Sequence, residues 1–178
     1  MSLALSINMV LLWVLLIFNL LLSLSIVKKL NEAGLGEPRF STLKKGAEAP
    51  DFEVEDIRGR KRSLADFGAD KVALVFSSSS CSPCREKIPE LAKMADKAQR
   101  AGYDLVIVSM DEASEARAFA EEHGITVPVL AAPLESSSIK EDYKVAGTPF
   151  FCVLDSERRV VASDFLNEEW EQIVASWA

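Results

Sequence analysis

The stretch Cys81-Ser82-Pro83-Cys84 decides the fold: two thiols spaced C-x-x-C directly after an apolar run, Val72–Phe76. The residues that follow, Arg85–Leu91, have the composition of a helix. The pair therefore lies at a predicted strand-to-helix junction, where unpaired N–H groups and the helix dipole stabilise an anion. Because the thiolate is the reactive form of cysteine, we expect Cys81 to attack and Cys84, one turn into the helix, to close the disulfide.

Two other interpretations of the pair are weaker. A zinc site would need two more ligands, and the only other cysteine and histidine, Cys152 and His123, do not occur in a paired ligand motif. We therefore expect no metal. A purely structural disulfide between such close neighbours would close a very small loop and stabilise the fold little. The pair is better explained by redox chemistry.

The N-terminal segment predicts a membrane anchor. Residues 1–27 contain no charged side chain, and Lys28-Lys29 end the run. At a rise of about 1.5 Å per residue, such a helix crosses a hydrocarbon core of about 30 Å. The run is long for a signal peptide, no basic residue precedes it, and no small-x-small cleavage site follows it. Because leucine, isoleucine and valine occupy all its faces, a buried core helix is disfavoured. We expect an uncleaved, single-pass anchor over residues 1–30.

The side of the membrane is indicated by two conflicting signals. Lys28-Lys29, directly after the span, would hold the following domain in the cytoplasm. A tethered dithiol is most useful where disulfides form and persist, which is outside the cytoplasm. We expect an extracytoplasmic domain on the cell membrane, against the bias of two lysines.

The charge balance limits the partners. The chain has 20 lysines and arginines against 27 aspartates and glutamates, a formal net charge of −7, and the acidic excess lies after Gly46. This balance argues against nucleic acid and against binding of the domain to anionic lipid. Three cysteines are too few for a disulfide scaffold.

A linker is predicted over residues 31–45, which contain Gly34, Gly36 and Pro38, and a domain over residues 46–178. Within the domain, apolar runs and helical patterns alternate, which predicts an α/β fold with a mixed central sheet flanked by helices. Strands are expected over 52–54, 71–76, 104–109, 127–130, 150–154 and 159–162, and helices over 84–99 (kinked at Pro89), 112–122, 137–143 and 168–177.

A second motif, Gly147-Thr148-Pro149, precedes the predicted strand 150–154, and a proline can open a strand because it has no N–H to give to the ladder. With Gly46-Ala-Glu-Ala-Pro50-Asp51-Phe52 and the C-x-x-C pair, this order resembles the thioredoxin-like superfamily across nearly all of residues 46–178. The opening motif and the anchor are similar to membrane-anchored TlpA/ResA-like thiol-disulfide oxidoreductases of the AhpC/TSA-Redoxin branch, and to MauD-type methylamine-utilisation proteins.

This resemblance implies a thioredoxin-like fold with no cofactor beyond the redox-active Cys81–Cys84 disulfide. It implies that Pro149 is cis and lies against the cysteines, and that substrate backbone pairs beside Thr148 as an added strand. Ser82 and Pro83 are then expected to contact substrate. The implied partners are protein thiols and disulfides and an integral-membrane redox partner.

The chain departs from thioredoxins at two positions near the site. Ser80 stands where thioredoxins usually carry tryptophan, and Val75 where they carry a buried aspartate. Related proteins can place an acid at the end of the third strand, and Asp111 (or Glu112) occupies that region. We expect Asp111 to take the proton of Cys84 during resolution. The alternative is that Asp111 only caps the following helix.

The remaining cysteine and histidine need no functional role. Alternation along the strand puts Cys152 on the same face as Phe150 and Leu154, so a buried, inert thiol is expected. His123 lies at a predicted helix end, where the dipole suits a cationic imidazole.

Two other functions compete with disulfide exchange. A peroxiredoxin-like peroxidase using Cys81 shares the opening Ala-Pro-x-Phe motif, but its P-x-x-x-T-x-x-C signature would need proline at Leu74 and threonine at Ser78. A scaffold without activity is disfavoured because both cysteines are present. The sequence therefore favours a membrane-tethered thiol-disulfide oxidoreductase acting on proteins.

Overall fold

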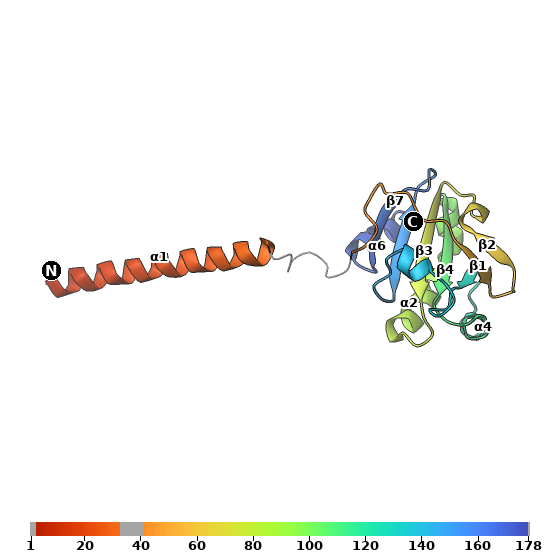
Figure 1. Cartoon of the computed structure of the whole chain (residues 1–178), viewed down its shortest axis with the longest axis horizontal. Helices are drawn as coiled ribbons and strands as arrows, with labels where there is room; N and C mark the ends of the chain where they lie inside the picture. Colours follow the sequence, from red (N-terminus) through yellow and green to blue (C-terminus); the bar gives the residue numbers. More distant parts are fainter. Residues whose placement is uncertain (1–2, 33–40, 178) are drawn as a thin grey trace. The chain divides into compact units, whose positions relative to one another are not determined.

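The computed structural model describes residues 3–32 and 41–177 of the chain. It divides into two units, Met1–Ser41 and the compact Thr42–Ala178, which are considered separately (Figure 1). The predicted linker over 31–45 falls largely on residues outside the described part, so its bounds stay a prediction.

The first unit holds one long helix, α1 (Leu3–Glu32). Its segment Ser6–Ile26 has a mean hydropathy of 2.6, and its residues are exposed. A helix with apolar side chains on every side has no core of its own to face. Its length and composition fit a membrane anchor or a signal segment.

The second unit is built on one seven-stranded mixed sheet with the order β2-β1-β5-β4-β3-β6-β7. Strands β3, β4 and β5 are parallel, and the other pairings are antiparallel. The strands are β1 (Glu53–Asp56), β2 (Lys61–Ser63), β3 (Lys71–Ser77), β4 (Tyr103–Ser109), β5 (Val129–Ala131), β6 (Phe150–Leu154) and β7 (Val160–Phe165). The predicted thioredoxin-like α/β fold with a mixed sheet is confirmed.

The helical segments are η1 (Leu64–Asp66), α2 (Ser82–Ala92), α3 (Ala95–Arg100), α4 (Ala113–Glu122), α5 (Ile139–Asp142) and α6 (Glu168–Ala175). The prediction of a single kinked helix over 84–99 is wrong, because the chain leaves the helix between α2 and α3. Pro89 lies inside α2 and has no N–H for the carbonyl four residues before it, which weakens the middle of the helix. The Met94 N–H then bonds to the Leu91 carbonyl at 2.9 Å, a tight turn that separates the two helices.

Two strands also differ from the expectation. Strand β5 begins at Val129 rather than at residue 127, and the preceding Pro128 has no N–H with which to join a ladder. Strand β2 was not predicted, because its three residues carry no apolar pattern and it lies at the edge of the sheet.

Both faces of the sheet are covered, which explains why the central strands are continuously apolar. In β3, Val72, Leu74 and Phe76 belong to one buried cluster, and Ala73 and Val75 belong to the other. The second cluster also contains buried residues of α2, α3, α4 and α6, and the first contains residues of η1 and α5. Strand β3 is therefore held from both sides up to Ser77, and the loop that carries the cysteines starts from a fixed point.

Candidate active site

Cys81 and Cys84 form a disulfide where β3 passes into α2, with their Cα atoms 5.2 Å apart. Cys81 is partly exposed, whereas Cys84 is completely buried in the cluster beneath α2. A molecule that approaches from solvent therefore meets the sulfur of Cys81 first. This asymmetry matches the predicted roles of an attacking and a resolving cysteine.

Cys81 is the N-cap residue of α2, and its sulfur accepts a hydrogen bond from the Cys84 N–H at 3.3 Å. Its backbone has the extended conformation typical of an N-cap, with φ −84° and ψ 110°. Pro83 stands in the first turn, where the missing N–H of proline costs no helical bond. The sulfur thus lies where the N–H groups of the helix stabilise a negative charge.

The Gly147-Thr148-Pro149 motif lies beside the cysteine pair, because β6 is paired with β3. The Thr148–Pro149 peptide bond is cis, and β6 begins at the next residue, with Phe150 paired to Phe76 of β3. The Thr148 carbonyl oxygen lies 3.4 Å from the Cys81 sulfur. The cis geometry and the position next to the cysteines are therefore as expected from the resemblance.

Thr148 keeps backbone groups available. Within the described part of the chain, no backbone hydrogen bond uses its N–H or its carbonyl oxygen. By contrast, the Pro149 carbonyl accepts a hydrogen bond from the Leu166 N–H at 3.4 Å. Ser82 and Pro83, at the start of α2, are exposed on the surface beside Cys81.

Asp111 lies two residues after the end of β4 and is partly buried. Its carboxylate accepts hydrogen bonds from the Ser78 hydroxyl at 2.8 Å, from the Ser79 N–H at 2.6 Å and from the Ser109 hydroxyl at 2.8 Å. Among the described residues, no hydrogen bond joins it to Cys81 or Cys84. The helix cap suggested as the alternative is not seen, because the N-cap residue of α4 is Glu112. Proton transfer from Cys84 to Asp111 stays a prediction.

The serines were not singled out from the sequence as functional residues. Ser78 and Ser79 belong to a run of four serines, which composition alone marks as a polar loop. Ser109 lies in an apolar strand, and its burial is the signal that a polar partner must be close.

Cys152 is fully buried in β6, in the same cluster as Phe150 and Leu154. Burial raises the pKa of its thiol to about 12, against a smaller lowering by Ser163. The expected burial of this thiol is confirmed, and its lack of reactivity stays a prediction. His123 ends α4 with its ring edge-on to Phe119, 4.6 Å between centroids.

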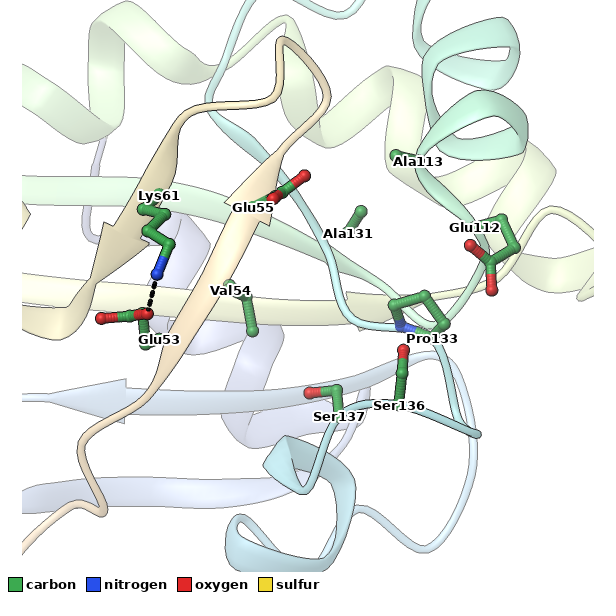
Figure 2. A pocket seen from close by; sticks show the side chains of 10 residues that line it. All are labelled: Glu53, Val54, Glu55, Lys61, Glu112, Ala113, Ala131, Pro133, Ser136 and Ser137. Atoms are coloured by element: carbon green, nitrogen blue, oxygen red, sulfur yellow. Dashed lines mark hydrogen bonds and ion pairs between the residues drawn. The ribbon is translucent and has the colours of Figure 1, made fainter.

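A pocket of about 320 Å³ is lined by Glu112 and by residues of β1, β5 and the loop that follows β5 (Figure 2). Its one lysine, Lys61, is already paired to Glu53 at 2.6 Å. Neither the cysteines nor the residues around Pro149 line this pocket. The partly exposed Cys81 therefore lies outside this pocket.

Comparison with known proteins agrees with this geometry. The sequence profile of the AhpC/TSA family matches residues 45–163. The thioredoxin-like protein YneN of Bacillus subtilis is 32% identical over 119 residues, which are 65% of this chain and 68% of YneN. The thiol-disulfide oxidoreductase ResA of Bacillus anthracis is 29% identical over 129 residues, which are 72% of this chain and 73% of ResA.

Solved structures show the same relationship. The thioredoxin domain of a thiol-disulfide oxidoreductase from Bacteroides vulgatus superposes with a TM-score of 0.67 at 25% identity, covering 76% of this chain and 99% of that domain. A protein described as thiol:disulfide interchange protein DsbE from Chlorobium tepidum has a TM-score of 0.66 at 28% identity, covering 77% and 100%. The chain therefore belongs to the AhpC/TSA family and, with its Cys81–Cys84 pair, is an enzyme of the thiol-disulfide oxidoreductase class that ResA and DsbE represent.

Proposed function

We propose that this protein is a membrane-tethered oxidoreductase that exchanges disulfides with protein substrates. The observation that carries the proposal is the asymmetry of the pair: Cys81 is partly exposed at the start of α2, and Cys84 is buried behind it. In the reducing direction, the Cys81 thiolate attacks one sulfur of a substrate disulfide. A mixed disulfide forms, and the other substrate sulfur leaves as a thiolate.

The mixed disulfide is resolved by Cys84 of the same protein. Cys84 loses its proton and attacks the Cys81 sulfur, which forms the Cys81–Cys84 disulfide and releases the second substrate sulfur. The two substrate sulfurs leave as thiols once protonated, and the enzyme has lost two electrons. Because Cys84 is completely buried, a second substrate molecule cannot reach it in place of Cys81. The same steps in reverse oxidise a substrate dithiol.

Thr148 is proposed to bind the substrate backbone. Its N–H and carbonyl oxygen make no backbone hydrogen bond among the described residues, and both lie beside Pro149 and the Cys81 sulfur. An extended peptide can pair with these backbone groups as an added strand, which would bring its cysteine to Cys81. Ser82 and Pro83 would form the opposite side of this contact, because they are exposed at the start of α2.

The proposal includes a place and a partner. With α1 as an anchor, the domain would lie outside the cytoplasm, where disulfides persist. Each turnover changes the oxidation state of the Cys81–Cys84 pair, so a redox partner must restore it, and we propose an integral membrane protein for this role because the domain is tethered. A MauD-like role would involve a membrane oxidant, whereas a ResA-like role would involve a reductant.

The proposed function is separated from the peroxidase alternative by comparing the rate of disulfide exchange with the rate of peroxide consumption. The full-length protein in detergent micelles is expected to catalyse reduction of insulin by dithiothreitol and to consume hydrogen peroxide slowly in stopped-flow measurements. Fast peroxide consumption through Cys81 with sluggish insulin reduction would establish the peroxidase alternative instead. The reduction potential of the Cys81–Cys84 couple then gives the direction: a value near that of thioredoxin indicates a reductase, and a much more oxidising one indicates disulfide formation.

The side of the membrane on which the domain lies can be tested by labelling Cys81 itself. A membrane-impermeant maleimide added to intact, mildly reduced cells is expected to label Cys81. Labelling that occurs only after the cells are lysed would place the domain in the cytoplasm, as the Lys28-Lys29 pair suggests.

A further inference from the structure

The carboxylate of Asp111 connects two neighbouring strands at the redox end of the sheet. Strands β3 and β4 are parallel, with Ser77 opposite Ser109, so the residues that follow each strand emerge side by side. Asp111 follows β4, and one of its oxygens accepts the hydrogen bond of the Ser78 hydroxyl. The other oxygen accepts from the Ser79 N–H and the Ser109 hydroxyl. One side chain thus holds the loop after β3 against the end of β4.

The same loop leads directly to the attacking cysteine. The Ser78 carbonyl accepts a hydrogen bond from the Cys81 N–H at 3.1 Å. The Ser78 hydroxyl also lies 2.8 Å from the Ser80 hydroxyl and accepts from the Ser80 N–H at 3.3 Å. Ser78 therefore contacts both the carboxylate and the backbone of Cys81, and a displacement of Ser78 is transmitted to the first residue of the redox pair.

The loop needs such a tether because it has no apolar side chain to fix it. Ser78 and Ser79 are only partly buried, and Ser80 is exposed. The stabilisation of a thiolate at Cys81 depends on its place at the α2 N-terminus, and this effect falls off within one helical turn. A loop that moves would carry the sulfur away from the Cys84 N–H, now 3.3 Å from it.

We propose that Asp111 is a positioning residue for Cys81, acting through a serine–aspartate clamp made of Ser78, Ser79, Ser109 and Asp111. The clamp holds the loop so that the Cys81 sulfur stays at the N-terminus of α2, and Asp111 does not itself take the proton of Cys84. The inference rests on the proposed function in one respect, the assignment of Cys81 as the attacking residue.

Alkylation of reduced Cys81 tests the clamp without any protein substrate. The rate with iodoacetamide is measured from pH 5 to 9 on the full-length protein in detergent micelles. Ser78→Ala removes the hydrogen bond to Asp111, together with the two contacts to Ser80, and changes no charge. It is expected to slow alkylation at pH 7 by about fivefold and to move the profile to higher pH. Asp111→Asn is expected to slow it at least as much, although loss of a nearby negative charge alone would stabilise the thiolate.

The double variant gives the sharpest result. If Ser78 and Asp111 act through one clamp, Ser78→Ala combined with Asp111→Asn should react within about twofold of the slower single variant. Additive effects would contradict the clamp. Faster alkylation in Asp111→Asn, with Ser78→Ala unchanged, would show that Asp111 acts through its charge alone.

Two controls and one direct measurement complete the test. Glu112→Gln removes a carboxylate one position away, and Ser114→Ala removes an exposed hydroxyl from α4; neither is expected to slow alkylation. Hydrogen exchange of the Ser79 N–H should accelerate in Asp111→Asn, even if alkylation cannot be measured, and unchanged exchange would overturn the proposal. If the alkylation pattern holds but insulin is not reduced, the clamp stands and the proposed function falls. If insulin is reduced but the pattern fails, only the clamp falls.

Discussion

Cys81 and Cys152 are the same residue type in two regions of one domain. Cys81 is partly exposed at the first turn of a helix, where its sulfur accepts a backbone N–H. Cys152 is fully buried in the middle of β6, and burial raises the pKa of its thiol to about 12. The helix end stabilises the charged form of a thiol, and the apolar core penalises it. The reactivity of a cysteine in this domain therefore depends on its position in the fold and not on its residue type.

The largest effect is expected from removing the attacking thiol. Cys81→Ser should lower insulin reduction at least about 1,000-fold, because a serine hydroxyl is a far weaker nucleophile at neutral pH. Cys84→Ser should instead accumulate a mixed disulfide, visible as a covalent adduct on non-reducing gels. The matched control, Cys152→Ala, should keep activity within about twofold. An equal loss of activity in Cys152→Ala would show that the two cysteines do not differ in the proposed way.

The next largest effect is expected in the rates at which Cys81 and Cys152 are alkylated in the native, reduced protein. At pH 8, a thiol with a pKa of about 12 is ionised in only about one molecule in ten thousand, and the side chain of Cys152 is also inaccessible. Iodoacetamide should therefore modify Cys81 about 100-fold faster than Cys152, as measured by peptide mass spectrometry. In guanidinium chloride the two rates should converge. Comparable rates in the native state would contradict the assignment of Cys152 as unreactive.

Stability above pH 9 measures the environment of Cys152 directly. Its pKa is raised from a usual value of 9.0 to about 12 in the folded state. Below pH 9 both states keep the proton, so the stabilisation is fully present there. Between pH 9 and 12 only the unfolded state releases the proton, so the free energy of unfolding should fall by about 1.4 kcal/mol per pH unit.

The matched comparison is between wild type and Cys152→Ala, both with the Cys81–Cys84 disulfide intact. Urea unfolding from pH 8 to 10.5 should give a steeper decline for wild type. Burial also raises the pKa of Tyr143, and Cys152 adds to that rise, so the difference in slope reports Cys152 together with its effect on Tyr143. The intercepts will differ because the smaller side chain leaves a cavity, so the slopes are compared. Parallel curves would show that Cys152 does not carry the shift.

The smallest effect concerns the contact between Gly147, which precedes the cis Thr148–Pro149 bond, and the core. A Cβ added at Gly147 would lie 3.3 Å from the Phe165 ring, which packs edge-on against Phe150. Gly147→Ala should therefore lower insulin reduction about twofold and the free energy of unfolding by about 1 kcal/mol or less. Gly68→Ala is the control, because a Cβ there meets nothing within 4 Å. Equal behaviour of the two variants would show that the loop and the core are not coupled at this contact.

The sequence predicted the elements that local patterns determine. The apolar run of β3, the C-x-x-C pair after it and the proline before β6 were all located correctly. These signals are strong because a strand covered on both faces must be apolar throughout, and because proline and a capping cysteine suit few backbone positions. The helix after the cysteines and the start of β5 were predicted less well, since a proline shifts a boundary in ways that neighbouring residues decide.

What the sequence by itself determined is the pair of cysteines, their place at a strand-to-helix junction, the apolar N-terminal span and the α/β class. Only the tertiary structure decided the two distant partners of Asp111, Ser79 and Ser78, which lie 32 and 33 positions away. The sequence identified Asp111 as a candidate acid but not its distant serine partners, because spacing along a chain does not state which strands pair. The parallel register of β3 and β4 brings these residues together, and that register comes from the packing of both faces of the sheet rather than from any local signal.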